Sequence, residues 1–281
     1  MWISPYKYVL SLGHLCSDIN QSILSAVLPF LIATYHYDYT TAAMLVTVSN
    51  VFGAFVQLFI GMLSDKKNKL LYMTLGVLLA SGGMAVTGFI SNFFGLCIVV
   101  IISGIGVVMF HPQAAKLVNS VSSKNAKGKG MSIFSFGGKV GFTLGPVYTA
   151  FLMNLFGMKG TILFLIPGIV FGIVCSFFNK DFENLDVLEV EKKEEVKSEQ
   201  KDDWSGFIKL CGVVFSRSIL SNGISTFLAF YFIQQFSKPN SFASMLLSVF
   251  YGIGSIATLL GGGIADCFGH RKMVRLSFCI F

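Results

Sequence analysis

The sequence predicts an all-α polytopic membrane protein, and three observations support this fold class. Of its 281 residues, 54% are hydrophobic and only 12% are charged, about half the charge of an average soluble domain. The apolar residues form runs long enough to cross a bilayer. A Gly-x-x-x-Asp pattern followed by basic residues occurs twice, each time in a short polar break between two such runs.

Eight apolar runs are predicted to span the membrane, and a ninth begins near the end of the chain. A spanning helix needs ~20 mostly apolar residues. Lipid offers no hydrogen-bond partners to open strand edges, so we expect helices throughout. The expected spans are 8–34, 40–63, 70–90, 94–117, 131–155, 160–178, 207–235 and 242–265.

The repeated pattern divides the chain into two related halves. Gly61 and Gly262 are separated by as many residues as Asp65 and Asp266, and duplication on this scale is typical of secondary transporters. We expect a six-helix bundle in 1–178, a charged cytoplasmic linker in 179–206 that is too polar to form a core, and an incomplete second bundle in 207–281. A chain that stops inside a ninth span could also be an inactive remnant.

The distribution of basic residues predicts the orientation. Lys and Arg gather in the breaks at 64–69, 116–130, 179–206 and 266–275, whereas the opposite breaks hold only Lys159 and Lys238. Basic loops stay in the cytoplasm, so we expect a multi-pass protein of the inner (cytoplasmic) membrane with a cytoplasmic N-terminus. The net charge of +7 is then a topology signal, and we expect the lipid bilayer and no nucleic acid as a partner.

Polar residues form a stripe on the first span. His14, Asp18 and Gln21 follow one another at i, i+4 and i+7, a spacing that places them on one helical face. A charge within the bilayer is costly and normally faces a wet interior. A carboxyl that exchanges a proton with alternate sides is what proton coupling requires. The alternative is a packing carboxyl neutralised by a cation.

Three isolated charges are predicted to share one level of the membrane. We expect Asp18, Lys139 and Arg217 each to lie ~12–15 Å from the inner boundary at ~1.5 Å per residue, the level where transporter sites usually lie. Two cations and one acid would attract an anionic or electron-rich substrate. In the competing interpretation, Asp18 pairs with one cation as a structural bridge.

Two further features accompany these charges. His111 precedes Pro112, which removes a backbone donor, and a role in a proton path competes with simple helix-end bonding. Gly137, Gly141 and Gly145 recur every four residues ahead of Pro146, a spacing that permits close helix packing. Lys139 lies ~200° around the helix from this ridge, so we expect it to face a cavity.

Several segments resemble the major facilitator superfamily and, within it, the fosmidomycin-resistance branch. They are the two Gly-x-x-x-Asp loops, the stripe from His14 to Gln21, the Phe110-His111-Pro112 segment, Gly137–Pro146 and Ser216-Arg217-Ser218. The resemblance implies a major facilitator-type helical bundle and a packing seam at the glycine ridge. It also implies that the two loops act as conformational latches, the alternative being charges that set topology only. The latch residues are Gly61, Asp65, Lys66, Lys69, Gly262, Asp266, Arg271 and Lys272.

These features predict a secondary active transporter that exports a small drug-like or anionic solute by alternating access, driven by the proton gradient. Uptake of an organic anion by the same fold stays open. No GxxxxGK[ST] fingerprint, nucleophile–base pattern or metal cluster occurs in the sequence. We therefore expect no enzymatic activity, no cofactor and no metal, and a monomer whose other partner is a small-molecule substrate.

Overall fold

The computed structural model describes residues 6–63, 69–122, 127–178 and 203–268, together with Lys272 and Arg275. Within these ranges all regular structure is helical, which confirms the predicted fold class. The long helices are α1 (Tyr6–Tyr35), α2 (Tyr39–Leu63), α3 (Lys69–Val86), α4 (Phe93–Ser120), α5 (Lys127–Phe156), α7 (Trp204–Phe236) and α8 (Asn240–Phe268), with 3-10 segments η1 (Thr87–Phe89) and η3 (Gly157–Leu165) and a further helix at 166–178.

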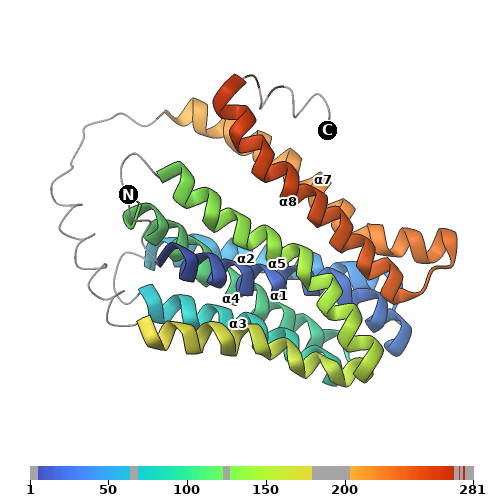
Figure 1. The fold of residues 1–281 in the computed structure, drawn as a ribbon. Helices are drawn as coiled ribbons and strands as arrows, with labels where there is room; N and C mark the ends of the chain where they lie inside the picture. Colours follow the sequence, from blue (N-terminus) through green and yellow to red (C-terminus); the bar gives the residue numbers. More distant parts are fainter. Residues whose placement is uncertain are drawn as a thin grey trace.

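Seven helical stretches of the described chain are long and apolar enough to cross a membrane, not the eight expected. The reason is that the spans expected at 131–155 and 160–178 are joined by η3 into one stretch of 49 residues, Gly130–Phe178. At ~1.5 Å per residue this stretch is more than twice as long as the hydrocarbon core is thick. The chain reverses in η3, and the helix at 166–178 returns beside α3, where Gly168 packs on Ser81 (Figure 1).

The first five helices and the helix at 166–178 form a bundle with α1 at its centre (Figure 1). In its most apolar window α1 is 78% buried, whereas α7 is 22% buried. Two large apolar clusters fill this bundle, one around Ile23 and Phe164 and the other around Phe110 and Phe171. This packing makes α1 the helix on which polar side chains are most shielded from lipid and water.

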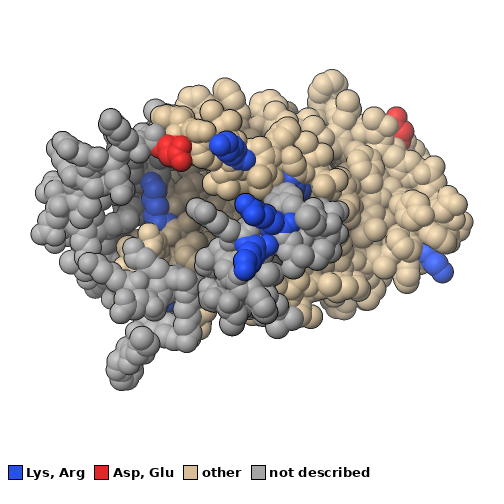
Figure 2. Space-filling model, turned by 90° about the horizontal axis from the view of Figure 1, so that it is seen from above, with Lys and Arg blue, Asp and Glu red and all other residues tan. Residues whose placement is uncertain are grey.

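The outer surface of the described chain is apolar. Large side chains such as Phe94 and Phe177 are 79% exposed, and most of the described surface in Figure 2 carries no charge. Exposed apolar area of this extent is typical of contact with lipid tails.

The helix pair α7–α8 meets the first bundle most closely at the end where residues 36–38 and 237–239 form turns. There Ser244 Oγ donates to Ala26 O at 2.9 Å, and Asn240 Nδ2 donates to Pro29 O at 3.2 Å. Toward the other end α8 diverges from α5 (Figure 1), and every residue of 203–220 is exposed. The two halves are therefore joined at one end and separated at the other.

Aspartate side chains cap the starts of α7 and α2. The linker was expected to reach residue 206, but α7 begins at Trp204 because the Asp203 side chain accepts a hydrogen bond from Gly206 N at 2.9 Å and caps the helix. Asp38 caps α2 in the same way by accepting from Thr41 N at 2.5 Å, and its hydrogen bonds from Thr41 lower the pKa of its carboxyl.

Candidate functional site

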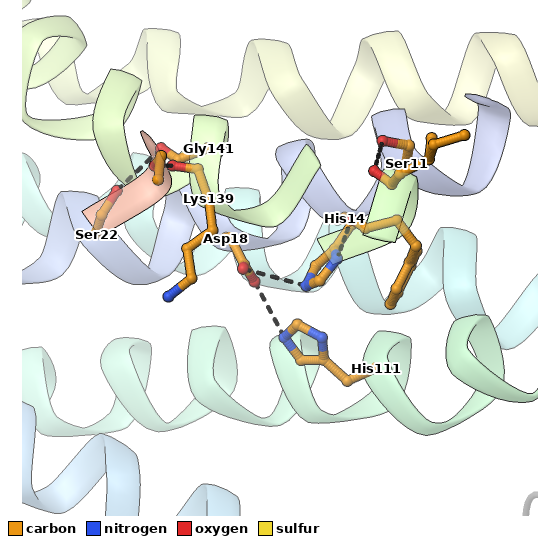
Figure 3. A network of polar contacts seen from close by, with 10 residues as sticks. Ser11, His14, Asp18, Ser22, His111, Lys139 and Gly141 are labelled. Carbon is orange, nitrogen blue, oxygen red and sulfur yellow. Dashed lines mark hydrogen bonds and ion pairs between the residues drawn. The ribbon is translucent and has the colours of Figure 1, made fainter. Parts of the chain in front are cut away.

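The buried carboxyl of Asp18 lies between two histidines from different helices (Figure 3). His14 Nε2, one turn earlier on α1, is 3.2 Å from Asp18 Oδ2, and His111 Nε2 on α4 is 3.1 Å from Asp18 Oδ1. Asp18 is only 5% exposed. We call these three residues the His–Asp–His cluster. The sequence placed His14 and Asp18 on one face, and the fold adds His111 from the neighbouring helix.

The tautomer of His14 follows from its second contact. His14 Nδ1 is 2.8 Å from Phe134 O, and because a carbonyl oxygen can only accept, Nδ1 carries a proton and donates it. His14 Nε2 would then present a lone pair to Asp18 Oδ2 unless a proton lies between them. The pair His14–Asp18 is therefore built to share a proton, whichever of the two atoms holds it.

Gly138 on α5 makes the room for this pair. A Cβ atom at Gly138 would lie 2.5 Å from Asp18 Oδ2 and 2.6 Å from His14 Nε2. The Phe134 ring, one turn earlier, stacks on His14 with a centroid distance of 4.0 Å. Sequence reasoning gave Gly138 no role, because it is not part of the four-residue repeat.

The ridge of Gly137, Gly141 and Gly145 lies directly against α1. A Cβ at these positions would collide with Ser11, Leu15 and Ser22, respectively. Pro146 is buried inside α5 and follows the ridge. The missing side chains let α5 approach α1 closely enough for the Phe134 carbonyl to reach His14.

A cavity of about 850 Å³ lies between the first bundle and the α7–α8 pair. Lys139 of α5, Arg217 of α7 and His111 all line it, as does Gln21 of α1. Lys139 therefore faces away from the glycine ridge and into the cavity. His14 and Asp18 are absent from the cavity wall, so His111 is the member of the cluster that reaches it.

The charges of the described cavity wall are all basic. Arg217 repels Lys139, while Asp18 attracts it from behind the wall. Among the described residues no carboxylate lines the cavity, and no ion pair joins Lys139 or Arg217 to an acid. The geometry therefore differs from a bridge between Asp18 and one cation.

Uncharged polar groups complete the cavity wall, and sequence reasoning did not identify them. They include the amides Asn20, Asn50, Gln57 and Asn222 and the hydroxyls of Ser49, Ser221 and Tyr251. The available signal was an amide within an apolar run, which is costly in a membrane unless it faces an interior. A cavity of this size and composition suits a small polar solute.

The ligand atoms of the His–Asp–His cluster lie within 4.8 Å of one another. Two imidazoles and a carboxylate at this spacing could hold a transition-metal ion. The ammonium of Lys139, which lies close enough to interact with Asp18 (Figure 3), opposes a divalent cation at this position. A shared proton fits these charges better.

Only some of the predicted latch residues lie within the described part of the chain. Asp65, Lys66 and Arg271 lie outside the described residues. Gly61 and Lys69 fall at the end of α2 and the start of α3, and Gly262 and Asp266 fall near the end of α8, in each case without a described side chain. Lys272 is exposed. The latch stays a prediction.

An all-helical membrane bundle with a polar cavity between two halves is the architecture of a polytopic membrane carrier. The family model of the Major Facilitator Superfamily matches residues 10–281, and the chain belongs to this superfamily. The resemblance inferred from the sequence motifs is thereby confirmed.

Relatives and solved structures agree with this family. The chain is 23% identical over 278 residues to an uncharacterized MFS-type transporter of Bacillus subtilis (strain 168), covering 97% of this chain and 68% of that protein. It is 22% identical to the fosmidomycin resistance protein of Escherichia coli (strain K12), covering 94% and 66%. The chain thus spans about two thirds of the length of these relatives.

The fold is similar to solved structures of the same architecture. A bacterial homolog of the human lysosomal transporter Spinster, in an inward-facing and occupied conformation, matches with a TM-score of 0.72 at 17% identity, covering 95% of this chain and 62% of that one. A D-xylose-proton symporter matches with a TM-score of 0.69 at 16% identity, covering 95% and 70%. At these identities the likeness establishes the fold alone.

Proposed function

We propose that the protein is a secondary active transporter that moves a small anionic solute across the cytoplasmic membrane by alternating access, coupled to protons. One observation carries the proposal: a cavity between the halves is lined by Lys139 and Arg217 and by no carboxylate of the described chain, directly beside a buried His–Asp–His cluster. The cavity supplies an anion site, and the cluster supplies a proton site.

The anion part follows from the cost of unpaired charge. An ionised side chain within the hydrocarbon region is stable only with a counter-charge or water around it. Lys139 and Arg217 face the same cavity and repel one another. A bound anion would relieve this repulsion, and the amides and hydroxyls around it would hydrogen-bond its remaining polar groups.

The proton part follows from the His–Asp–His cluster. Asp18 has two imidazole partners and a nearby ammonium, so adding or removing a proton changes which groups neutralise the carboxylate. Such a change alters the electrostatic energy of a buried site by roughly several kcal/mol, which is about the cost of breaking a buried ion pair. An energy of this size is sufficient to bias one of two conformations.

Separate observations bear on the direction of transport and on the orientation. Efflux is the direction that the resemblance to the fosmidomycin-resistance branch favours, and the Escherichia coli relative carries that name. Uptake by the same site is the second candidate, since the cation-lined cavity suits an organic anion moving in either direction. The basic loops favour a cytoplasmic N-terminus.

Accumulation of labelled small organic anions in whole cells tests this proposal. The panel comprises a phosphonate, a sugar phosphate and a hydroxycarboxylate, each measured with and without a protonophore. Efflux predicts lower accumulation in cells that express the full-length protein than in control cells, and uptake predicts higher accumulation. In both cases the protonophore abolishes the difference. Equal accumulation of every probe in both kinds of cell overturns the proposal.

A further inference from the structure

His111 belongs to both the proposed proton site and the proposed anion site. Its Nε2 is 3.1 Å from Asp18 Oδ1, and its side chain is 31% exposed, compared with 7% for Asp18 and 13% for His14. It also lines the cavity together with Lys139 and Arg217. No other member of the His–Asp–His cluster touches the cavity, so His111 separates the buried carboxyl from the space that would hold the anion.

On the opposite side of the cluster, both ring nitrogens of His14 have partners. His14 Nδ1 donates to Phe134 O, its ring stacks on the Phe134 ring, and Gly138 packs against the His14–Asp18 pair. His14 therefore has no second nitrogen with which to pass a proton onward. His14 Nε2 shares a proton with Asp18 and passes it no further.

His111 has the freedom that His14 lacks. One ring nitrogen faces Asp18, and among the described residues no hydrogen bond occupies the other, Nδ1. A ring in this position can take a proton at Nδ1 from the cavity and release the proton on Nε2 to Asp18. One proton then leaves the cavity and another reaches the carboxyl. Lys139 also faces the cavity near Asp18, but no ion pair joins them.

We propose that His111 carries protons between the cavity and Asp18 and that the proton and the anion load together, so that both move in the same direction. The proposal rests on the proposed anion site. Among the described residues, the charged and titratable groups in contact with His111 are His14 and Asp18, and Lys139, Arg217 and Tyr251 line the same cavity. A proton on His111 adds a third positive charge to the wall that attracts the anion.

The sign of the coupling follows from reciprocity. If a proton on the cluster strengthens anion binding, then a bound anion strengthens proton binding by the same factor. Exchange of a solute for protons requires the opposite, because each must expel the other. Cooperative loading instead lets an inward proton gradient drive the anion inward, so the inference chooses uptake from the two directions left open above.

The experiment is equilibrium binding of methanesulfonate to the purified protein by titration calorimetry, because the charge of this probe stays constant between about pH 5.5 and 8. Wild-type protein should bind it about tenfold more tightly at the lower pH. In the His111→Asn and His111→Gln variants the two dissociation constants should be equal. Unfolding temperatures of the variants show that each is folded.

His36→Asn is the matched control. His36 lies in the turn between α1 and α2 with a φ of 57°, a conformation that Asn tolerates, and it does not line the cavity. This variant should keep the wild-type pH dependence. Weaker binding at low pH, or an unchanged pH dependence in both His111 variants, overturns the inference. Absence of binding at every pH overturns the proposed anion site itself.

Discussion

The His–Asp–His cluster and the cavity beside it hold charge in opposite ways. In the cluster a buried acid lies between two bases, and a glycine lets the surrounding helices pack closely. In the cavity two cations face open space without an acid on the described wall. The first arrangement can be neutralised by moving a proton, whereas the second requires a ligand. The difference supports the proposed division, in which protons bind at the cluster and the anion binds in the adjacent cavity.

Removing the carboxylate should have the largest effect, because it eliminates the centre of the cluster. In Asp18→Asn the two histidines lose the negative charge and the proton-binding carboxylate between them, and we expect proton-driven accumulation to fall to the level of vesicles without the protein. Methanesulfonate binding above neutral pH should persist, since the cavity keeps both cations. Accumulation in vesicles with an imposed pH gradient and calorimetry measure the two effects.

Asp38→Asn is the control for that variant. Asp38 is an exposed cap of α2, and Asn caps helices as well as Asp does, so transport should be unchanged. If Asp18→Asn retains proton-driven accumulation, the cluster is a packing device and the contrast with the cavity disappears.

Adding one methyl group should disturb the cluster without removing any of its polar atoms. In Gly138→Ala the new Cβ would lie 2.5 Å from Asp18 Oδ2 and 2.6 Å from His14 Nε2, too close for either atom to keep its place. We therefore expect a loss of roughly 1–3 kcal/mol in stability together with slower proton-driven transport. Gly82→Ala offers a matched control, since nothing lies within 4 Å of a Cβ there. Thermal unfolding in detergent compares the two, and equal midpoints would contradict the close packing described.

The cavity should respond to changes that leave the cluster intact. We expect Lys139→Asn to weaken methanesulfonate binding about tenfold at constant pH, because one of two cations is lost. Lys238→Asn, in the turn between α7 and α8, removes the same charge at a residue that does not line the cavity and should have no effect. Unchanged transport kinetics in Lys139→Asn would refute a substrate role for this residue.

The sequence predicted the helical spans, but it left open whether Asp18 pairs with one of the cations or stands apart from them. Hydrophobic runs place each span, and the i, i+4 spacing places His14 beside Asp18. The contact of His111 with Asp18 joins α4 to α1, which depends on how the helices pack rather than on spacing along the chain. The role of Gly138 was hidden for the same reason: its value lies in what approaches it from α1.

The smallest effect should come from the contacts that join the two halves. Ser244 is buried and donates to Ala26 O at 2.9 Å, so Ser244→Ala should remove about 1 kcal/mol from the joined state, roughly a fivefold change in a two-state ratio. Ser216→Ala is the control, because Ser216 is exposed and bonds only within α7. Distance distributions between spin labels at Lys159 and Lys238, one on each half, measure the ratio. If both variants give the wild-type distribution, Ser244 does not hold the halves together, and the cavity must be closed at that end by its apolar contacts, Ala26 with Ala243 and Leu247.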